Sequence, residues 1–153
     1  MPLHPFVVHF PIVLMIVAGV LYFLSILQKG EKSTQWRLLG FYAHAAGVGM
    51  LLLAIVTGDL AETEIVHTPE IAKMAKTHEM LGMISAWGFG LMGVWAYLRQ
   101  KSNIYWESVV YVILFWGIIG VMGYSAHMGG RMVYEEGAGV APMKPHLEML
   151  KQK

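Results

Sequence analysis

Histidine is the residue type in this chain with the clearest capacity for chemistry, because a neutral imidazole nitrogen binds iron and other transition metals. The chain has seven histidines and no cysteine. Three of the histidines, His9, His78 and His127, stand in or beside three separate apolar segments. The absence of cysteine excludes iron–sulfur ligation and the covalent attachment of a c-type haem. The histidines therefore indicate a metal, or a haem held without covalent bonds.

The apolar segments that carry these histidines are long enough to cross a membrane. Of the 153 residues, 56% are hydrophobic and 14% are charged, whereas a soluble domain carries about 25% charged residues. The apolar residues form four blocks that each reach the roughly 20 residues needed to span a bilayer. Because the blocks are continuous rather than alternating, they indicate helices and not barrel strands. We predict helices over residues 6–27, 36–58, 69–98 and 106–128, and a polar tail over 131–153.

These segments predict one all-α transmembrane domain over residues 1–153. The connections are short, so neighbouring helices should run antiparallel in an up-down four-helix bundle. No internal repeat is apparent in the sequence. The net charge is +1 and no basic stripe is present, which argues against nucleic acid as a partner.

The positive charges predict how the bundle lies in the membrane. Lys29, Lys32 and Arg37 fall in the first connection, and Arg99 and Lys101 fall in the third. Lysine and arginine in short loops favour the cytoplasmic side. We therefore expect a bacterial inner-membrane protein with both termini in the periplasm and most carboxylates on the outer side.

With this topology, His9, His78 and His127 reach a common depth near the outer face. Ionisable residues in membrane helices are rare and usually functional. Glycines recur every three or four residues on the face of His127, where they would let a flat macrocycle approach. These glycines are Gly117, Gly120 and Gly123.

A b-type haem fits this pattern, because its iron takes two axial ligands from facing helices. We expect His9 and His78 as the ligand pair, with His127 as the alternative ligand. Gly130 and Arg131 follow His127, and the arginine is placed to pair with a haem propionate. One haem is expected rather than two, and a quinone is a further candidate ligand.

The remaining polar residues are weaker candidates. His4, like His67 and His146, also suits a role as an interfacial side chain. His44 lies deeper, and a second haem there would find no other histidine at its depth. Asp59 could orient a histidine ring, or it could be a solvated residue at a helix end.

Several short motifs resemble a known family. Residues 4–11 read His-Pro-Phe-Val-Val-His-Phe-Pro, and Gly58 with Asp59, His78, and Gly129 with Gly130 follow in order. This pattern resembles a family of small bacterial membrane proteins catalogued as a domain of unknown function, number 2231. The match covers nearly the whole chain.

The resemblance implies a fold similar to that of four-helix b-type cytochromes, because some family members resemble or are joined to cytochrome-containing modules. Five polar residues of this chain stand at positions that match the family pattern: His4, His9, Asp59, His78 and His127. Family members often have a histidine where Glu136 stands, so a ligand role at that position is absent here. The resemblance implies no particular activity.

The sequence thus predicts an electron-transfer subunit rather than a stand-alone enzyme. Such a protein would carry electrons between the quinone pool and a periplasmic partner, either a c-type cytochrome or other subunits of a redox complex. The alternative is a cofactor-free membrane anchor or assembly subunit of a larger respiratory complex, with its glycine faces serving helix packing alone.

Overall fold

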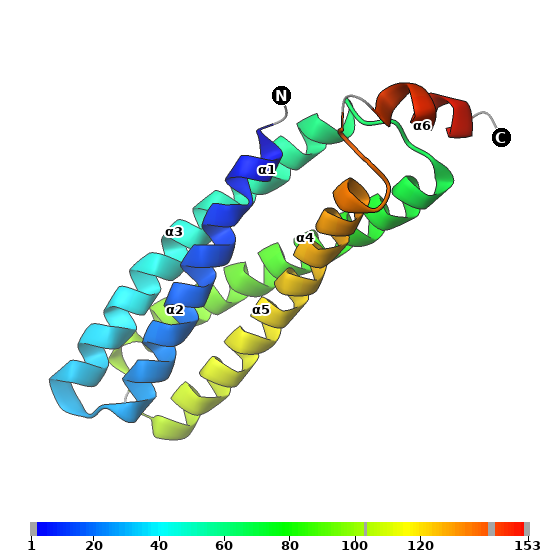
Figure 1. Ribbon diagram of the computed structural model, residues 1–153. Coiled ribbons are helices and arrows are strands. Elements are labelled where there is room, and N and C mark those ends of the chain that lie inside the picture. Colours follow the sequence, from blue (N-terminus) through cyan, green and yellow to red (C-terminus); the bar gives the residue numbers. More distant parts are fainter. Residues whose placement is uncertain (1–2, 103, 141–142, 152–153) are drawn as a thin grey trace.

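The computed structural model describes residues 3–102, 104–140 and 143–151, and every regular element in these residues is a helix. The elements are α1 (His4–Val7), α2 (His9–Leu27), α3 (Gly30–Glu62), α4 (Pro69–Leu98), the 3-10 turn η1 (Arg99–Lys101), α5 (Tyr105–Tyr134) and α6 (Lys144–Lys151). Figure 1 shows that the four long helices lie beside one another as a bundle.

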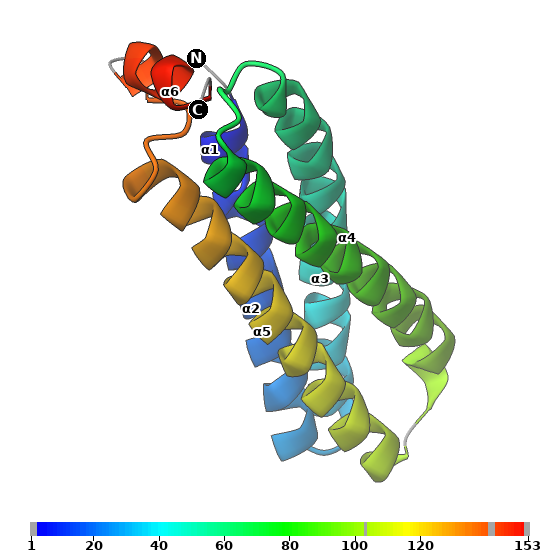
Figure 2. The same cartoon turned by 90° about the vertical axis from the view of Figure 1, so that its right-hand side faces the viewer.

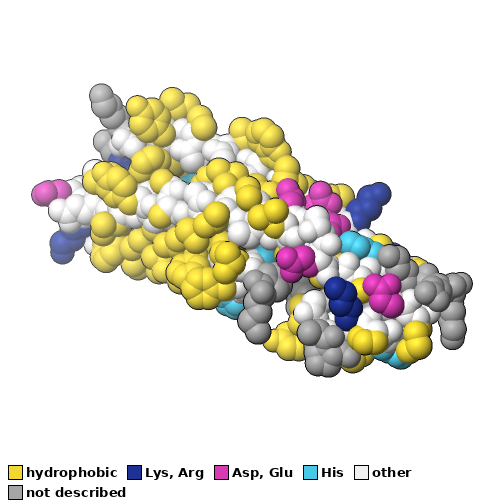
Figure 3. Space-filling view, turned by 90° about the horizontal axis from the view of Figure 1, so that it is seen from above, with side chains coloured by type: hydrophobic (Ala, Val, Ile, Leu, Met, Phe, Trp, Pro, Cys, Tyr) yellow, Lys and Arg dark blue, Asp and Glu magenta, His cyan; other side chains and the backbone are white. Residues whose placement is uncertain are grey.

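Four helices are long and apolar enough to cross a membrane: α1 together with α2, α3, α4 and α5. Their outer sides carry large exposed apolar residues such as Trp87, Leu91 and Ile113. Figure 3 shows hydrophobic side chains along the sides of the bundle and charged side chains toward its ends. A surface of this kind suits lipid and not water. The chain is therefore an integral membrane protein.

The two ends of the bundle differ in the elements that they hold. The α2–α3 connection and the α4–α5 connection, which contains η1, lie at one end in Figure 1. The start of α1, the α3–α4 connection and α6 lie at the other end, as Figure 2 also shows. We call the former the Arg99 end and the latter the His4 end.

Two of the helices extend beyond the predicted apolar blocks. The sequence predicts a second helix over 36–58, but α3 begins at Gly30 and ends at Glu62. The fourth is predicted over 106–128, but α5 continues to Tyr134. Glu31, Lys32 and Gln35 favour a helix almost as strongly as leucine does, so α3 begins before its apolar block. Helix α5 continues through Gly129 and Gly130 despite the low helix propensity of glycine. Residues 141–142 and 152–153 of the expected polar tail lie outside the described residues.

The first and third spans show local features that the sequence indicates. Helix α1 ends at Val7 and α2 begins at His9, because Pro11 has no amide hydrogen for the carbonyl of Val7. Helix α4 covers Pro69–Leu98, and the Thr68 side chain caps it by accepting from the Ile71 amide at 3.3 Å. The break sets the end of α1, which carries His4, and the cap sets the start of α4, which carries His78.

The bundle consists of two helical hairpins in which several buried positions follow the same spacing. Helix α2 packs along α3, α4 packs along α5, and the hairpins meet through α2 with α5 and α3 with α4. Buried positions recur at identical spacing on α2 and α4: Pro11, Met15, Ala18 and Tyr22 against Ser85, Phe89, Met92 and Ala96. The same holds for α3 and α5: His44, Leu51 and Ala54 against Phe115, Met122 and Ser125. The residue types differ, so the duplication is visible in burial and not in the sequence.

Candidate functional site

At the His4 end of the bundle, two histidine rings from different helices lie close together. The ring centroids of His4 in α1 and His78 in α4 are 6.2 Å apart, and the ring planes make an angle of 81°. Both side chains are half-buried. The two histidines are equivalent in the two hairpins, since His4 precedes Pro11 by the same interval that separates His78 from Ser85. The pair therefore lies where the halves of the bundle meet.

Each of the two rings is held through its Nδ1 atom. His4 Nδ1 lies 2.9 Å from the carbonyl oxygen of Ala54, and His78 Nδ1 lies 2.8 Å from that of Ser125. Because a carbonyl can only accept, each Nδ1 carries the hydrogen and each Nε2 keeps its lone pair. A backbone bond at one ring nitrogen is the usual support for a histidine that binds a metal through the other.

Two hydroxyl groups support the same assignment of the ring hydrogens. Thr57 Oγ1 lies 3.4 Å from His4 Nδ1 and donates to a backbone carbonyl of its own helix. Ser125 Oγ lies 3.1 Å from His78 Nδ1 and donates to the His78 carbonyl at 2.9 Å. Since each hydroxyl hydrogen is already used, each oxygen can only accept from the neighbouring ring. The Nε2 atoms are therefore the groups available for chemistry.

Glycines let both rings approach the neighbouring backbone. A Cβ atom at Gly58 would lie 3.1 Å from His4 Cε1, and one at Gly129 would lie 3.2 Å from His78 Cε1. Each glycine stands one helical turn after the residue whose carbonyl accepts from the histidine. In each hairpin, therefore, a backbone carbonyl and the glycine one turn later hold one histidine ring.

The site supplies two metal donors and no more. Among the described residues, no group of three or more histidine, aspartate or glutamate side chains is placed to hold a metal ion. Zinc in proteins usually takes three or four protein ligands. Haem iron needs only two, because the porphyrin provides the other four. The donor set therefore fits a metal that arrives within a macrocycle better than a bare ion.

The structure brings His78 together with His4, and no third histidine among the described residues joins them. His9 and His127 are exposed on the outer sides of their helices, and the His127 ring lies 6.4 Å from that of Tyr124. Five residues of helix correspond to a rotation of about 140°, so His9 cannot share the direction of His4. His127 stands midway between Ser125 and Gly129, and residues two apart on a helix point to opposite sides.

The other expected site residues also lie apart from the pair. Arg131 pairs with Glu135 through Nη2 at 2.8 Å, and Asp59 is exposed at the end of α3. A Cβ atom at Gly130 would meet no atom within 4 Å. The glycines expected to face a macrocycle are exposed on the outer side of α5: Gly117, Gly120 and Gly123.

His44 belongs to a second polar cluster in the interior of the bundle. The residue is 1% exposed, and its Nε2 atom donates to the Phe89 carbonyl at 3.0 Å. Its Nδ1 atom lies 3.4 Å from the hydroxyl groups of both Tyr22 and Tyr111. Both nitrogens of His44 therefore have protein partners, unlike those of the pair at the His4 end.

A signal for the role of His4 is present in the sequence. His4 continues the stripe of buried residues on the first span, which runs through Val7, Pro11 and Met15 at steps of three and four. His9 falls outside that stripe. Helical periodicity applied to this short N-terminal segment would have placed His4, and not His9, toward the other helices.

The membrane-spanning helices and the half-buried imidazole pair define the class of the protein, a helical integral membrane protein with a built histidine site near one end. The chain belongs to the family described as predicted membrane protein (DUF2231), whose model matches residues 1–142. This confirms the family that the sequence resembles. No curated protein and no solved structure matches the chain.

Proposed function

We propose that this protein is an electron-transfer subunit that binds one b-type haem through His4 and His78. The observation that carries the proposal is the pair of half-buried rings, each anchored at Nδ1 and free at Nε2. The two ring centroids lie 6.2 Å apart, and the Nε2 atoms are the groups that would hold the iron. The haem would supply one-electron oxidation and reduction.

The chain's own residues would position this group. Ala54 and Ser125 hold the two rings in one tautomer by accepting from Nδ1, which also raises the basicity of each Nε2. Gly58 and Gly129 let the rings lie against the helices. The fold would then be an up-down bundle similar to the four-helix b-type cytochromes, with ligands from two diagonal helices.

The charges support a direction for electron transfer. Lys29, Lys32 and Arg37 lie at the Arg99 end, which the distribution of basic residues favours as cytoplasmic. The His4 end would then face the periplasm of a bacterial inner membrane. Its acidic residues, among them Glu62 and Glu64, suit docking of a basic partner such as a c-type cytochrome. Electrons would pass between the quinone pool and that partner.

A second candidate function is a cofactor-free anchor or assembly subunit, and one observation favours it. The Nδ1 bonds of His4 and His78 join α1 to α3 and α4 to α5. Such bonds between membrane helices are each worth on the order of 1 kcal/mol. The histidines could therefore serve packing alone.

Replacing each histidine by asparagine separates the two functions. An asparagine amide can donate from near the position of Nδ1, but it has no group that replaces Nε2 as a ligand. We expect the purified wild-type protein to show Soret and α-band shifts in a reduced-minus-oxidised spectrum. His4→Asn and His78→Asn should remove these bands and leave the helical content unchanged, whereas His9→Asn and His127→Asn should keep them. A wild-type protein without such bands contradicts the haem proposal and favours the anchor.

A further inference from the structure

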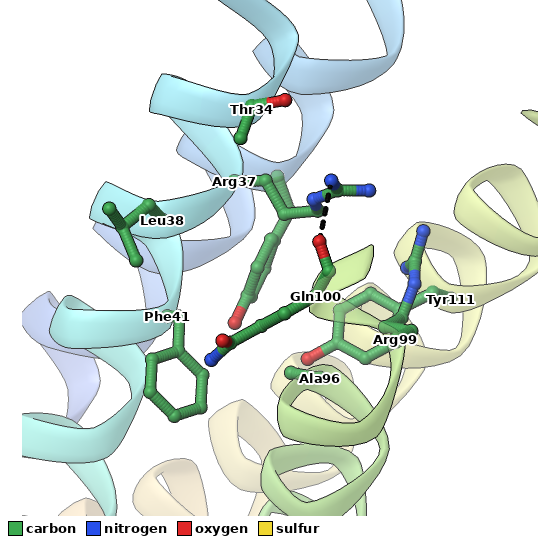
Figure 4. Close-up of a pocket in the computed structure, with 9 residues that line it drawn as sticks. Thr34, Arg37, Leu38, Phe41, Ala96, Arg99, Gln100 and Tyr111 are labelled. Atoms are coloured by element: carbon green, nitrogen blue, oxygen red, sulfur yellow. Dashed lines mark hydrogen bonds between the residues drawn. The ribbon is translucent and has the colours of Figure 1, made fainter. Parts of the chain in front are cut away.

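The Arg99 end holds a cavity that the histidine pair does not use. It has a volume of about 100 Å³ and lies between α2, α3, η1 and α5. Figure 4 shows Arg37 and Phe41 on one side of it and Arg99 and Tyr111 on the other. Thr34 and Leu38, two of the residues that line the cavity, are exposed on α3. A molecule in the bilayer surface can therefore enter it from the side.

Arg99 is the most unusual residue that lines the cavity. It is 5% exposed, and its guanidinium lies over the Tyr111 ring at 4.9 Å. In the part of the chain that the structure describes, its buried Nε has no hydrogen-bond acceptor, and the nearest carboxylate oxygen belongs to Glu107 at 3.8 Å. Burial lowers the pKa of Arg99 and Glu107 raises it, but an arginine stays protonated. A buried donor without an acceptor is costly, so the site favours a ligand with acceptor oxygens.

Two tyrosine hydroxyl groups connect the cavity to the interior of the bundle. Tyr22 and Tyr111 both line the cavity, and both hydroxyls lie 3.4 Å from His44 Nδ1. Tyr111 donates to the Met92 carbonyl at 3.2 Å, so the Tyr22 hydroxyl is the group that donates to His44 Nδ1, which can only accept. Polar groups buried at this depth in a membrane protein are usually functional.

Comparison of the two hairpins shows that packing does not require these polar groups. The positions equivalent to His44 and Tyr22 are occupied by Phe115 and Ala96 in the second hairpin. The residue equivalent to Arg99 is Ser25. Apolar or small side chains thus fill the same places in the other half. Tyr22 and Arg99, which have smaller counterparts in the other hairpin, both line the cavity.

The lining favours a flat neutral ring over a phosphate group. Tyr22, Phe41 and Tyr111 supply aromatic walls, and Leu38 adds an aliphatic side chain. A cavity of roughly 150 Å³ encloses a benzene ring in another protein. This cavity, at about 100 Å³, would enclose only part of a quinone ring, and the rest of the ring would lie at the open side. The Arg37 guanidinium already donates to two backbone carbonyls, at 2.6 and 3.0 Å. A doubly charged phosphate would find too few free donors.

We propose that this cavity binds the ring of a lipid-soluble quinone, with a ring carbonyl oxygen accepting a hydrogen bond from Arg99. The isoprenoid tail would leave past Thr34 and Leu38 into the bilayer. This assignment rests on the proposed electron-transfer function, for which it supplies the second redox site at the opposite end of the bundle. Apolar walls with a few convergent donors are typical of sites for such ligands.

Binding of a short-chain alkyl benzoquinone to the full chain in lipid nanodiscs tests the proposal. Equilibrium dialysis should show one saturable site in the wild-type protein. Arg99→Met keeps the length of the side chain but removes its donors, and should weaken binding about tenfold, which corresponds to one lost hydrogen bond in a buried site. Tyr105→Phe changes an exposed tyrosine at the same end and should leave the affinity unchanged. Equal affinities for wild type and Arg99→Met, at equal helical content, would overturn the proposal.

Two further arms identify the ligand and separate this proposal from the haem proposal. Ala96→Leu fills the cavity and should abolish quinone binding while the helical content stays at the wild-type value. Nanodiscs with and without phosphatidylglycerol should give equal quinone affinity, because competition by the anionic lipid would assign the site to a phosphate. His78→Asn should bind quinone with wild-type affinity despite losing haem. A protein that binds haem but shows no saturable quinone binding would contradict only the quinone proposal. A protein that binds quinone but shows no haem would contradict only the haem proposal.

Discussion

At the scale of single residues, position on the helix decides what each histidine can do. His4 and His78 point toward neighbouring helices and each use one nitrogen for a carbonyl. His44 uses both nitrogens and is enclosed by protein. His9 and His127 are exposed. One residue type therefore provides two anchored rings, a buried hydrogen-bonding group and two outward-facing side chains.

The two adjacent glycines at the end of α5 allow a matched test of how His78 is seated. A Cβ atom would lie 3.2 Å from the His78 ring at Gly129, but would meet nothing within 4 Å at Gly130. Gly130→Ala should stabilise the protein by about 0.5–1 kcal/mol, because alanine loses less backbone entropy in a helix. Gly129→Ala should be less stable than Gly130→Ala by on the order of 1 kcal/mol, because it crowds the ring. Thermal unfolding in detergent, followed by circular dichroism, measures both.

The absorption spectrum of the proposed haem provides a second measurement on the same pair of variants. Gly129→Ala should shift or broaden the absorption bands, since the ring that it displaces is a proposed ligand. Gly130→Ala should leave them unchanged. Equal stabilisation by both substitutions would contradict the contact between His78 and Gly129.

At the scale of helices and their ends, a side-chain cap fixes where the helix that carries His78 begins. Thr68 is 3% exposed and accepts from the Ile71 amide, which fixes the first turn of α4. Ile71 packs with Val66 and Ala138 in a small core at the His4 end. The start of α4 is thus tied to the segment after α5, and His78 follows two turns further along.

Removal of this cap gives a prediction at the helix scale. Thr68→Ala should destabilise the protein by about 1 kcal/mol, because the Ile71 amide loses its acceptor in a buried place. Amide hydrogen exchange at Ile71 should also become faster. Thr77→Ala is the control, since Thr77 only bonds back to the Lys73 carbonyl within the helix and alanine is the better helix former. If exchange at Ile71 is unchanged in Thr68→Ala, the cap does not hold the helix start.

The sequence predicts helices well and contacts between them poorly, for a physical reason. Apolar blocks and the Thr68–Pro69 start signal predict the spans, because lipid demands long helices with internally bonded backbones. Depth in the membrane also follows from counting residues. The direction of each side chain depends on rotation of 100° per residue, and counting depth alone cannot distinguish His4 from His9. The pairing of His4 with His78 therefore required the packed structure.

At the scale of the whole molecule, two equivalent hairpins produce two different ends. The His4 end keeps the equivalence, because each hairpin contributes a histidine, an accepting carbonyl and a glycine. At the Arg99 end the two hairpins differ, because His44, Tyr22 and Arg99 have apolar or small residues at the matching positions. A shared site at the junction and an asymmetric site beside one hairpin suit a protein that exchanges electrons between two different partners.

The orientation of these ends in the membrane is open to a direct test, because the chain has no native cysteine. Lys29→Cys places a single thiol in the exposed α2–α3 connection, and Glu64→Cys places one in the exposed α3–α4 connection. With basic residues on the cytoplasmic side, a membrane-impermeant maleimide should label Glu64→Cys in intact spheroplasts. It should label Lys29→Cys only after the membrane is permeabilised. The reverse pattern would place the histidine pair near the cytoplasm and would contradict docking of a periplasmic electron carrier at that end.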